Sequence, residues 1–174
     1  YGSSGTDFEL SLDIKDPAAA PAVVAVAEEH GAAGRLWLCS SSFDRLGSWR
    51  ERWAKVRLSA STQRDVLGPG VLSDLAGRGV DVVNLRERDW DQRLIDDVHE
   101  AGLLAFGWDA QTARQLDRLL GLGIDAVYSD HVARMVDALR RAADRSEPGE
   151  ARDRPDEHEG AADQEALRDR ADGA

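Results

Sequence analysis

Two ionisable side chains stand two residues apart near the start of the chain, in a stretch where apolar and polar residues alternate. From Leu10 to Lys15, every second residue is apolar, and Ser11, Asp13 and Lys15 occupy the positions between. Because successive side chains point to opposite faces of a strand, the three polar groups are predicted to share one face. A carboxylate beside an ammonium can hold a cation next to a phosphate. This face is therefore a candidate site for an anionic substrate or a metal, and a buried ion pair is the alternative interpretation.

The elements that must position these residues follow a regular alternation of strand and helix. Six short runs are predicted to be strands: Phe8–Lys15, Arg35–Ser40, Val56–Thr62, Val80–Arg86, Leu103–Trp108 and Ala126–Asp130. Amphipathic patterns predict helices at Ala19–His30, Phe43–Trp53, Val71–Ala76, Asp91–Ala101, Ala113–Leu120 and Val132–Ala143. This alternation predicts an α/β fold with a parallel sheet.

The number of units leaves two architectures open. Six strand–helix units are two too few for a closed (β/α)8 barrel, and a doubly wound sheet of six strands is the competitor. The doubly wound fold usually binds phosphate with a glycine-rich first turn, whereas the first turn here reads Lys15–Ala18, with an aspartate and a proline inside it. In a barrel, the polar face of the first strand would open at the C-terminal mouth, where active sites lie.

Four segments resemble those of glycerophosphodiester phosphodiesterases, in the same order along the chain. The segment Ser11–Lys15 is similar to the Asn-x-Glu-x-Lys strand of that family, and Ser42–Phe43 to the Ser-Phe after its next strand. Phe106–Trp108 resembles the penultimate strand, and Gly123–Asp130 the closing Gly-Val-Asp-x-Ile-x-Thr-Asp segment. In the family, the Asn-x-Glu-x-Lys strand is the third of eight. The resemblance thus implies an incomplete (β/α)8 TIM-type barrel of about six βα units that lacks the first two.

The resemblance also implies a reaction, which is the metal-dependent hydrolysis of glycerophosphodiesters to sn-glycerol 3-phosphate and an alcohol. The implied cofactor is Mg²⁺ or Ca²⁺, and Asp13 matches one of its carboxylate ligands. Lys15 matches the lysine that faces the phosphate, while Phe43 and Trp108 match apolar walls of the substrate site, with simple packing as their alternative role. Asp13 and Ser11 stand where the family has glutamate and asparagine, so the carboxylate arm is one methylene shorter.

The remaining catalytic groups of the family have no counterpart in this sequence. There is no His-Arg-Gly motif and no Glu-x-Asp at the end of an early apolar strand. Of the four histidines, only His131 falls on the predicted mouth, where the family has no general acid, so no catalytic residue is assigned. We expect the N-terminal catalytic segment of the domain to be missing and this chain alone to be inactive. A degenerate, non-catalytic barrel that binds phosphorylated ligands or a partner protein is the alternative, and a different phosphate-handling barrel is the third interpretation.

Composition restricts the partners and divides the chain. The formal net charge of −11 argues against a nucleic-acid partner, and no apolar run approaches the about 20 residues of a transmembrane helix. Residues 1–143 are predicted to form the partial barrel. Residues 144–174, with eleven acidic residues against five arginines, are predicted to be a disordered acidic tail. A single cysteine, Cys39, suits a cytoplasmic protein, but secretion stays open because the chain begins at Tyr1.

Overall fold

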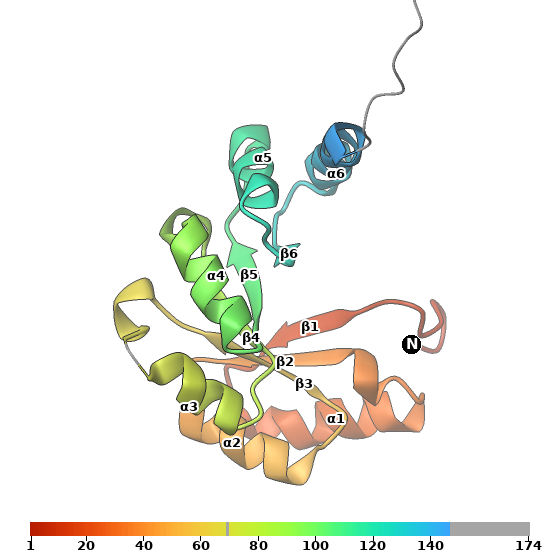
Figure 1. Ribbon diagram of the computed structural model, residues 1–174. Coiled ribbons are helices and arrows are strands. Elements are labelled where there is room, and N and C mark those ends of the chain that lie inside the picture. Colours follow the sequence, from red (N-terminus) through yellow and green to blue (C-terminus); the bar gives the residue numbers. More distant parts are fainter. Residues whose placement is uncertain (69, 147–174) are drawn as a thin grey trace, which may run out of the picture.

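The computed structural model describes residues 1–68 and 70–146 and contains one parallel sheet (Figure 1). Its strands are β1 (Leu10–Asp13), β2 (Leu36–Ser40), β3 (Arg57–Ser61), β4 (Val82–Arg86), β5 (Leu104–Trp108) and β6 (Ala126–Val127). Each strand lies beside the one before it in the chain, in the order β1-β2-β3-β4-β5-β6, and all pairs are parallel. A doubly wound sheet requires the strand order to reverse at a switch point, so that alternative is excluded.

The helices of the described residues lie on the outside of the curled sheet (Figure 1). They are α1 (Ala20–Glu29), α2 (Phe43–Arg52), α3 (Val71–Gly77), α4 (Gln92–Glu100), α5 (Ala113–Gly121) and α6 (Val132–Ser146). Short 3₁₀ turns occur at Pro17–Ala19, Ala33–Arg35, Arg64–Val66 and Glu87–Asp89. The predicted alternation and the incomplete barrel-type fold are confirmed. The first strand is shorter than predicted, because it ends at Asp13 and a turn that begins with Asp16 and Pro17 follows.

The two faces of the sheet bury different side chains. The outer face carries small and aliphatic residues, among them Leu38, Leu58 and Leu85, which are fully buried beneath the helices. The inner, concave face holds a separate cluster built on Trp37, Val82 and Phe106. The rings of Trp37 and Phe106 lie 5.1 Å apart in a tilted arrangement. The concave face is therefore a packed interior and not an open channel, as in small barrels.

The two edge strands face each other across this interior. Among the described residues, β1 pairs only with β2, and β6 pairs only with β5. Ser11 from β1 and Tyr128, which follows β6, nevertheless meet: their hydroxyl oxygens are 2.8 Å apart. The sheet is thus curled far enough for side chains of its first and last strands to form a hydrogen bond.

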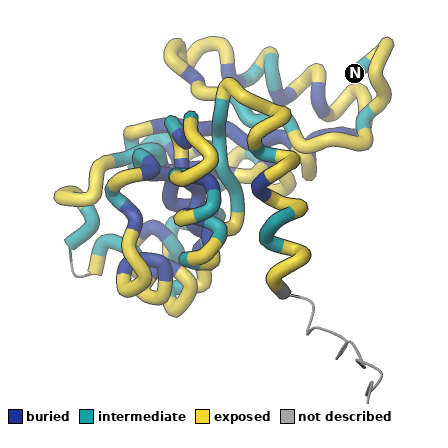
Figure 2. Tube along the Cα trace, turned by 90° about the horizontal axis from the view of Figure 1, so that it is seen from above, coloured by how far each residue is buried: buried dark blue, intermediate teal, exposed yellow. Residues whose placement is uncertain are grey.

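Exposed apolar side chains gather at the two ends of the row of helices. On α6, Val132, Val136 and Leu139 form a stripe with exposed fractions of 70%, 40% and 56%. At the other end, Phe8 precedes β1 and Val26 lies on α1, and both are exposed. Figure 2 shows exposed segments (yellow) along α6 as far as the last described residues. These two flanks, Phe8 with Val26 and the stripe on α6, are where a closed barrel would have neighbouring helices.

Two aspartates fix the neighbouring strands at the N-terminal edge of the sheet. Asp81 and Asp125 each follow a glycine by two residues and immediately precede β4 and β6. The Asp81 carboxylate accepts a hydrogen bond from the Leu58 amide of β3 at 2.7 Å. The Asp125 carboxylate accepts one from the Ala105 amide of β5, also at 2.7 Å. Each carboxylate thus holds the backbone of the preceding strand and supports the register of the sheet.

We expect Asp125→Ala to destabilise the fold, because it leaves the Ala105 amide without this acceptor in a partly buried position. The free energy of unfolding should fall by about 1–3 kcal/mol. Urea unfolding followed by circular dichroism measures this loss. Asp65→Ala, which removes an exposed carboxylate, serves as the matched control. An equal loss in both variants would contradict the proposed role of Asp125.

The C-terminal part of the chain is described as far as residue 146. Helix α6 ends at Ser146, three residues beyond the boundary that the sequence predicted at 143. The rest of the predicted acidic tail lies outside the described residues. Within residues 1–68 and 70–146, no helix has the length and apolar character needed to cross a membrane.

Candidate functional site

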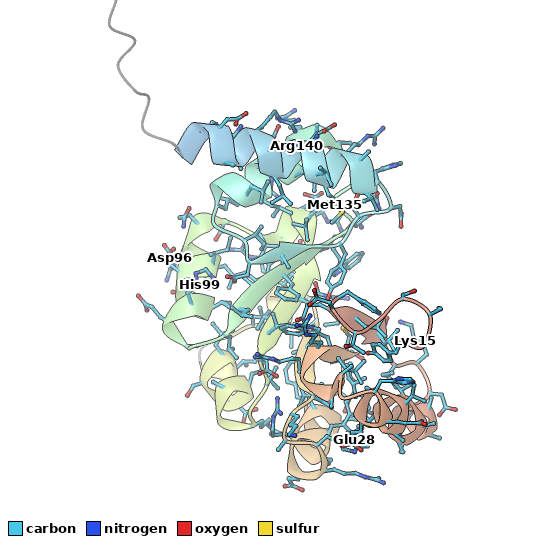
Figure 3. The ribbon with its side chains drawn as sticks, turned by 90° about the vertical axis from the view of Figure 1, so that its right-hand side faces the viewer. Lys15, Glu28, Asp96, His99, Met135 and Arg140 are labelled. Atoms are coloured by element: carbon cyan, nitrogen blue, oxygen red, sulfur yellow. The ribbon has the colours of Figure 1, made fainter. Side chains whose placement is uncertain are left out.

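Asp13 and Lys15 lie together at the C-terminal end of β1. The Lys15 ammonium donates a hydrogen bond to Asp13 Oδ2 at 2.5 Å. The two side chains are 55% and 85% exposed, respectively, and Figure 3 shows Lys15 in the loop beyond the strand. The alternative of a buried ion pair is therefore wrong. The pair is presented to solvent at the edge of the sheet where the predicted mouth lies.

Ser11, which shares the face of Asp13, has a structural partner that the sequence did not reveal. Its hydroxyl lies 2.8 Å from the Tyr128 hydroxyl and 3.3 Å from Cys39 Sγ. Burial raises the pKa of Tyr128 to about 12, although the hydrogen bond with Ser11 acts in the opposite direction. A neutral phenol thus bridges the two edge strands at physiological pH.

Stability should fall in strongly alkaline solution because of Tyr128. Its pKa is about 12 in the folded chain against 10.0 for an unperturbed tyrosine, so the folded state binds the phenolic proton more tightly. The resulting stabilisation is fully present below about pH 10 and is lost as the pH rises through about 12. Denaturant unfolding at a series of pH values tests this.

Tyr128→Phe is the control for that experiment, because it leaves Tyr1 as the only tyrosine. The difference between the phenolate absorbance of the two proteins isolates the titration of Tyr128. The variant should lose less stability than the parent chain between about pH 10 and 12. The same loss in both proteins would show that other groups cause the decline.

The two predicted aromatic residues line one hollow at the mouth. Ser42 caps α2 by accepting a hydrogen bond from the Arg45 amide, and Phe43 is the first residue of that helix. Phe43 and Trp108, the last residue of β5, both border a hollow of about 760 Å³. The other lining residues are Ser41, Asp44, Ser61, Thr62, Gln63, Val66 and Arg78. Asp13 and Lys15 lie outside this lining, at the end of a neighbouring strand.

Trp108 is held in place by charged neighbours. The Arg86 guanidinium lies over its indole ring, 5.5 Å from the centroid. Arg86 in turn donates two hydrogen bonds to one carboxylate oxygen of Asp109, at 2.6 and 3.0 Å. Hydrogen bonds from Arg86 and then Gln111 lower the pKa of Asp109, which adopts a positive φ of 66° directly after the strand. The Arg86–Asp109 ion pair thus keeps a guanidinium against one face of Trp108 at the mouth.

Close packing on the outer face of the sheet explains the glycine in Phe106–Trp108. A Cβ at Gly107 would come within 3.0 Å of the Leu119 side chain of α5. Trp90, which is fully buried, donates its indole N–H to the Phe106 carbonyl at 3.0 Å. The close approach of α5 and Trp90 to β5 explains why this position has no side chain.

The sequence missed the polar residues of the hollow. Ser59 and Ser61 alternate along β3 as Ser11 and Asp13 do along β1, so the same argument could have found Ser61 and the following Thr62. The long-range pairing of Arg78 with Asp44, at 2.8 Å, left no local signal.

The three histidines of the described residues lie apart from one another. His131 follows β6, and its amide donates to the Ser129 hydroxyl. His30 ends α1, and His99 on α4 contacts Asp125 at 2.8 Å on the opposite edge of the sheet. Of these three, only His131 therefore lies near the predicted mouth, and His158 lies outside the described residues.

The described residues do not by themselves fit a complete cation site. Within residues 1–68 and 70–146, no three His, Cys, Asp or Glu side chains come together as metal ligands would. Asp13, the predicted ligand, is paired with Lys15. A hard cation takes six or more oxygen ligands, of which this chain offers one carboxylate at that position.

The fold resembles that of known phosphodiesterases. No protein-family model and no curated protein matches the chain. Among solved structures, a putative glycerophosphoryl diester phosphodiesterase from Silicibacter pomeroyi superposes with a TM-score of 0.68 and 20% identity, covering 78% of this chain and 51% of that one. A second putative glycerophosphoryl diester phosphodiesterase, from Agrobacterium tumefaciens, superposes with a TM-score of 0.65 and 20% identity, covering 79% of this chain and 58% of that one.

A third similar structure is a complex with a reaction product. It is an Oleispira antarctica phosphodiesterase in complex with the product sn-glycerol-3-phosphate, with a TM-score of 0.60 and 18% identity over 69% of this chain and 48% of that one. The chain thus spans about half the length of the structures it resembles. The predicted resemblance is confirmed for the fold, which is that of glycerophosphodiester phosphodiesterase barrels.

Proposed function

We propose that this chain forms the greater part of a barrel that hydrolyses glycerophosphodiesters to sn-glycerol 3-phosphate and an alcohol. The observation that carries the proposal is the exposed Asp13–Lys15 pair at the C-terminal edge of a sheet with this fold. Active sites of such barrels lie at this edge. Phe43 and Trp108 border a hollow at the same edge. The substrate is a small molecule.

Each residue has a role in this proposal. The Lys15 ammonium binds the phosphate of the substrate as a point charge. Asp13 supplies one carboxylate toward Mg²⁺ or Ca²⁺, whose other ligands come from outside the described residues, and a bound cation would polarise the phosphoryl oxygen. Phe43 and Trp108 pack against the glycerol or alcohol part.

We further propose that a preceding segment of the same domain, with two strand–helix units, completes the barrel. The unpaired edges of β1 and β6 support it, because an exposed edge offers a row of unpaired backbone groups to another strand. The stripe Val132, Val136 and Leu139 on α6 supports it independently, since an apolar helix face is normally packed against a neighbour. The chain alone is then expected to be inactive.

The coding sequence directly upstream of Tyr1 tests this part. It should encode a strand with His-Arg-Gly and a strand with Glu-x-Asp, because those residues supply the missing histidine and metal ligands in the family that the chain resembles. A start codon immediately before Tyr1, together with a soluble monomer, would contradict the proposal.

One observation favours a second candidate, a non-catalytic barrel that binds phosphorylated ligands. The Asp13 carboxylate, one methylene shorter than glutamate, is already paired with Lys15 at 2.5 Å. In that case, glycerophosphodiesters would bind to the completed protein without being hydrolysed.

In the protein that includes the upstream segment, Lys15→Ala and Asp13→Ala should each lower kcat/KM for glycerophosphodiesters on the order of 100-fold, because Lys15 binds the phosphate and Asp13 would help to hold the cation that polarises it. Stability should change little, since both side chains are exposed. The assay measures release of sn-glycerol 3-phosphate with Mg²⁺ or Ca²⁺ supplied.

Lys55→Ala and Asp96→Ala are the matched controls. Lys55 is the only other lysine and is exposed, and Asp96 lies on the exposed side of α4 (Figure 3). Both controls should keep full turnover. Unchanged turnover in the Asp13 and Lys15 variants would refute the site, and binding without turnover in the parent protein would favour the second candidate.

A further inference from the structure

The hollow beside Trp108 is large enough to hold part of a substrate. It lies at the C-terminal ends of three strands, with Ser41 after β2, Ser61 at the end of β3 and Trp108 at the end of β5. Its volume of about 760 Å³ falls in the range of small-molecule sites. The chemistry of its walls therefore bears on which alcohol it accepts.

The charges that line the hollow neutralise each other. Among the described residues, Asp44 and Arg78 are the charged members of the lining, and the Arg78 guanidinium donates to Asp44 Oδ1 at 2.8 Å. A second carboxylate, Asp74, accepts from Arg78 Nε at 2.7 Å from outside the lining. These two partners raise the pKa of Arg78, so it stays charged. Arg78 already pairs with one oxygen of Asp44, so the charged side chains of the lining leave no net negative charge to attract a cationic head group.

The aromatic wall is also poorly suited to a cation. Quaternary ammonium groups are recognised over the faces of aromatic rings. One face of Trp108 already carries the Arg86 guanidinium. This leaves the other face of Trp108 and the single ring of Phe43, which is less than an aromatic cage provides.

The uncharged polar side chains of the hollow have spare hydrogen-bonding capacity. Among the described residues, the side chains of Ser61, Thr62 and Gln63 make no hydrogen bond, although the Thr62 amide donates to the Asn84 carbonyl. Hydroxyl and amide groups both donate and accept. They match an alcohol with several hydroxyl groups, which also donate and accept, whereas a trimethylammonium group does neither.

We propose that this hollow selects glycerophosphodiesters whose alcohol is neutral and polyhydroxylated over those whose alcohol is cationic. The inference rests on the proposed function, because it assigns the alcohol part of that substrate to the hollow. Thr62 and Gln63 determine the selectivity through hydrogen bonds, and Phe43 and Trp108 pack against the carbon skeleton.

The binding of two small molecules to this chain tests the inference, and both molecules contain the same glycerophosphate half. The probes are sn-glycero-3-phospho-myo-inositol and sn-glycero-3-phosphocholine, and saturation-transfer NMR measures their Kd and which protons contact the protein. We expect the inositol diester to bind at least about 10-fold more tightly, with saturation on its ring protons, which corresponds to about 1.4 kcal/mol.

The outcomes separate this inference from the proposed function. Equal or tighter binding of the choline diester would overturn the selectivity and leave the proposed function standing. Absence of binding for both diesters would overturn the assignment of the alcohol to this hollow, whereas turnover in the protein that includes the upstream segment decides the proposed function.

A double variant, Thr62→Val with Gln63→Met, gives a second test. It removes the hydrogen-bonding groups while keeping their size, and Gln63 is exposed and Thr62 half-buried, so the fold should persist. The preference for the inositol diester should fall to near parity. Gln92→Met on α4, at the outside of the sheet, is the control and should keep the preference. A double variant with an unchanged unfolding midpoint and an unchanged preference would overturn the assignment.

Discussion

Parallel pairing of strands in chain order is the constraint on which the rest of the structure depends. Each strand of this sheet hydrogen-bonds to its predecessor, and the connecting helices lie on the outer face (Figure 1), as successive right-handed crossovers require. The sheet must then curl, and the C-terminal ends of all strands converge on one side. Residues as far apart in sequence as Asp13, Phe43 and Trp108 reach a common mouth for this reason. Within the part of the chain that the structure describes, the same constraint leaves both ends of the row of helices without a neighbouring helix.

Most of the fold was predictable because its signals are local. Alternation and helical periodicity located the six strands and six α-helices of the described residues, and the alternation along β1 predicted which of its side chains share a face. The sequence also placed Asp13 and Lys15 side by side, as the structure has them. Their exposure could not be read from alternation, since the same pattern suits a buried pair. Only the curl of the sheet decides between the two.

The parts that the sequence did not reveal depend on contacts between distant segments. The Arg86–Asp109 ion pair beside Trp108 joins residues that are 23 positions apart in the sequence, and the Arg78–Asp44 pair joins residues that are 34 positions apart. No periodicity encodes such pairs, because each partner alone looks like an ordinary charge on a helix, in a loop or at a strand end. The sequence likewise gives no signal for the positive φ of Asp109, the residue whose carboxylate accepts the hydrogen bonds of Arg86.

The hydrogen bond between Ser11 and Tyr128 links the first strand to the segment that follows the last strand. Ser11 has a short side chain whose hydroxyl lies 2.8 Å from the phenol across the concave face. Tyr128 is buried enough for its pKa to rise to about 12, so an ionised or unpaired phenol there would be costly. The Ser11 hydroxyl therefore gives the buried phenol a hydrogen-bond partner and ties the first strand to the other end of the sheet.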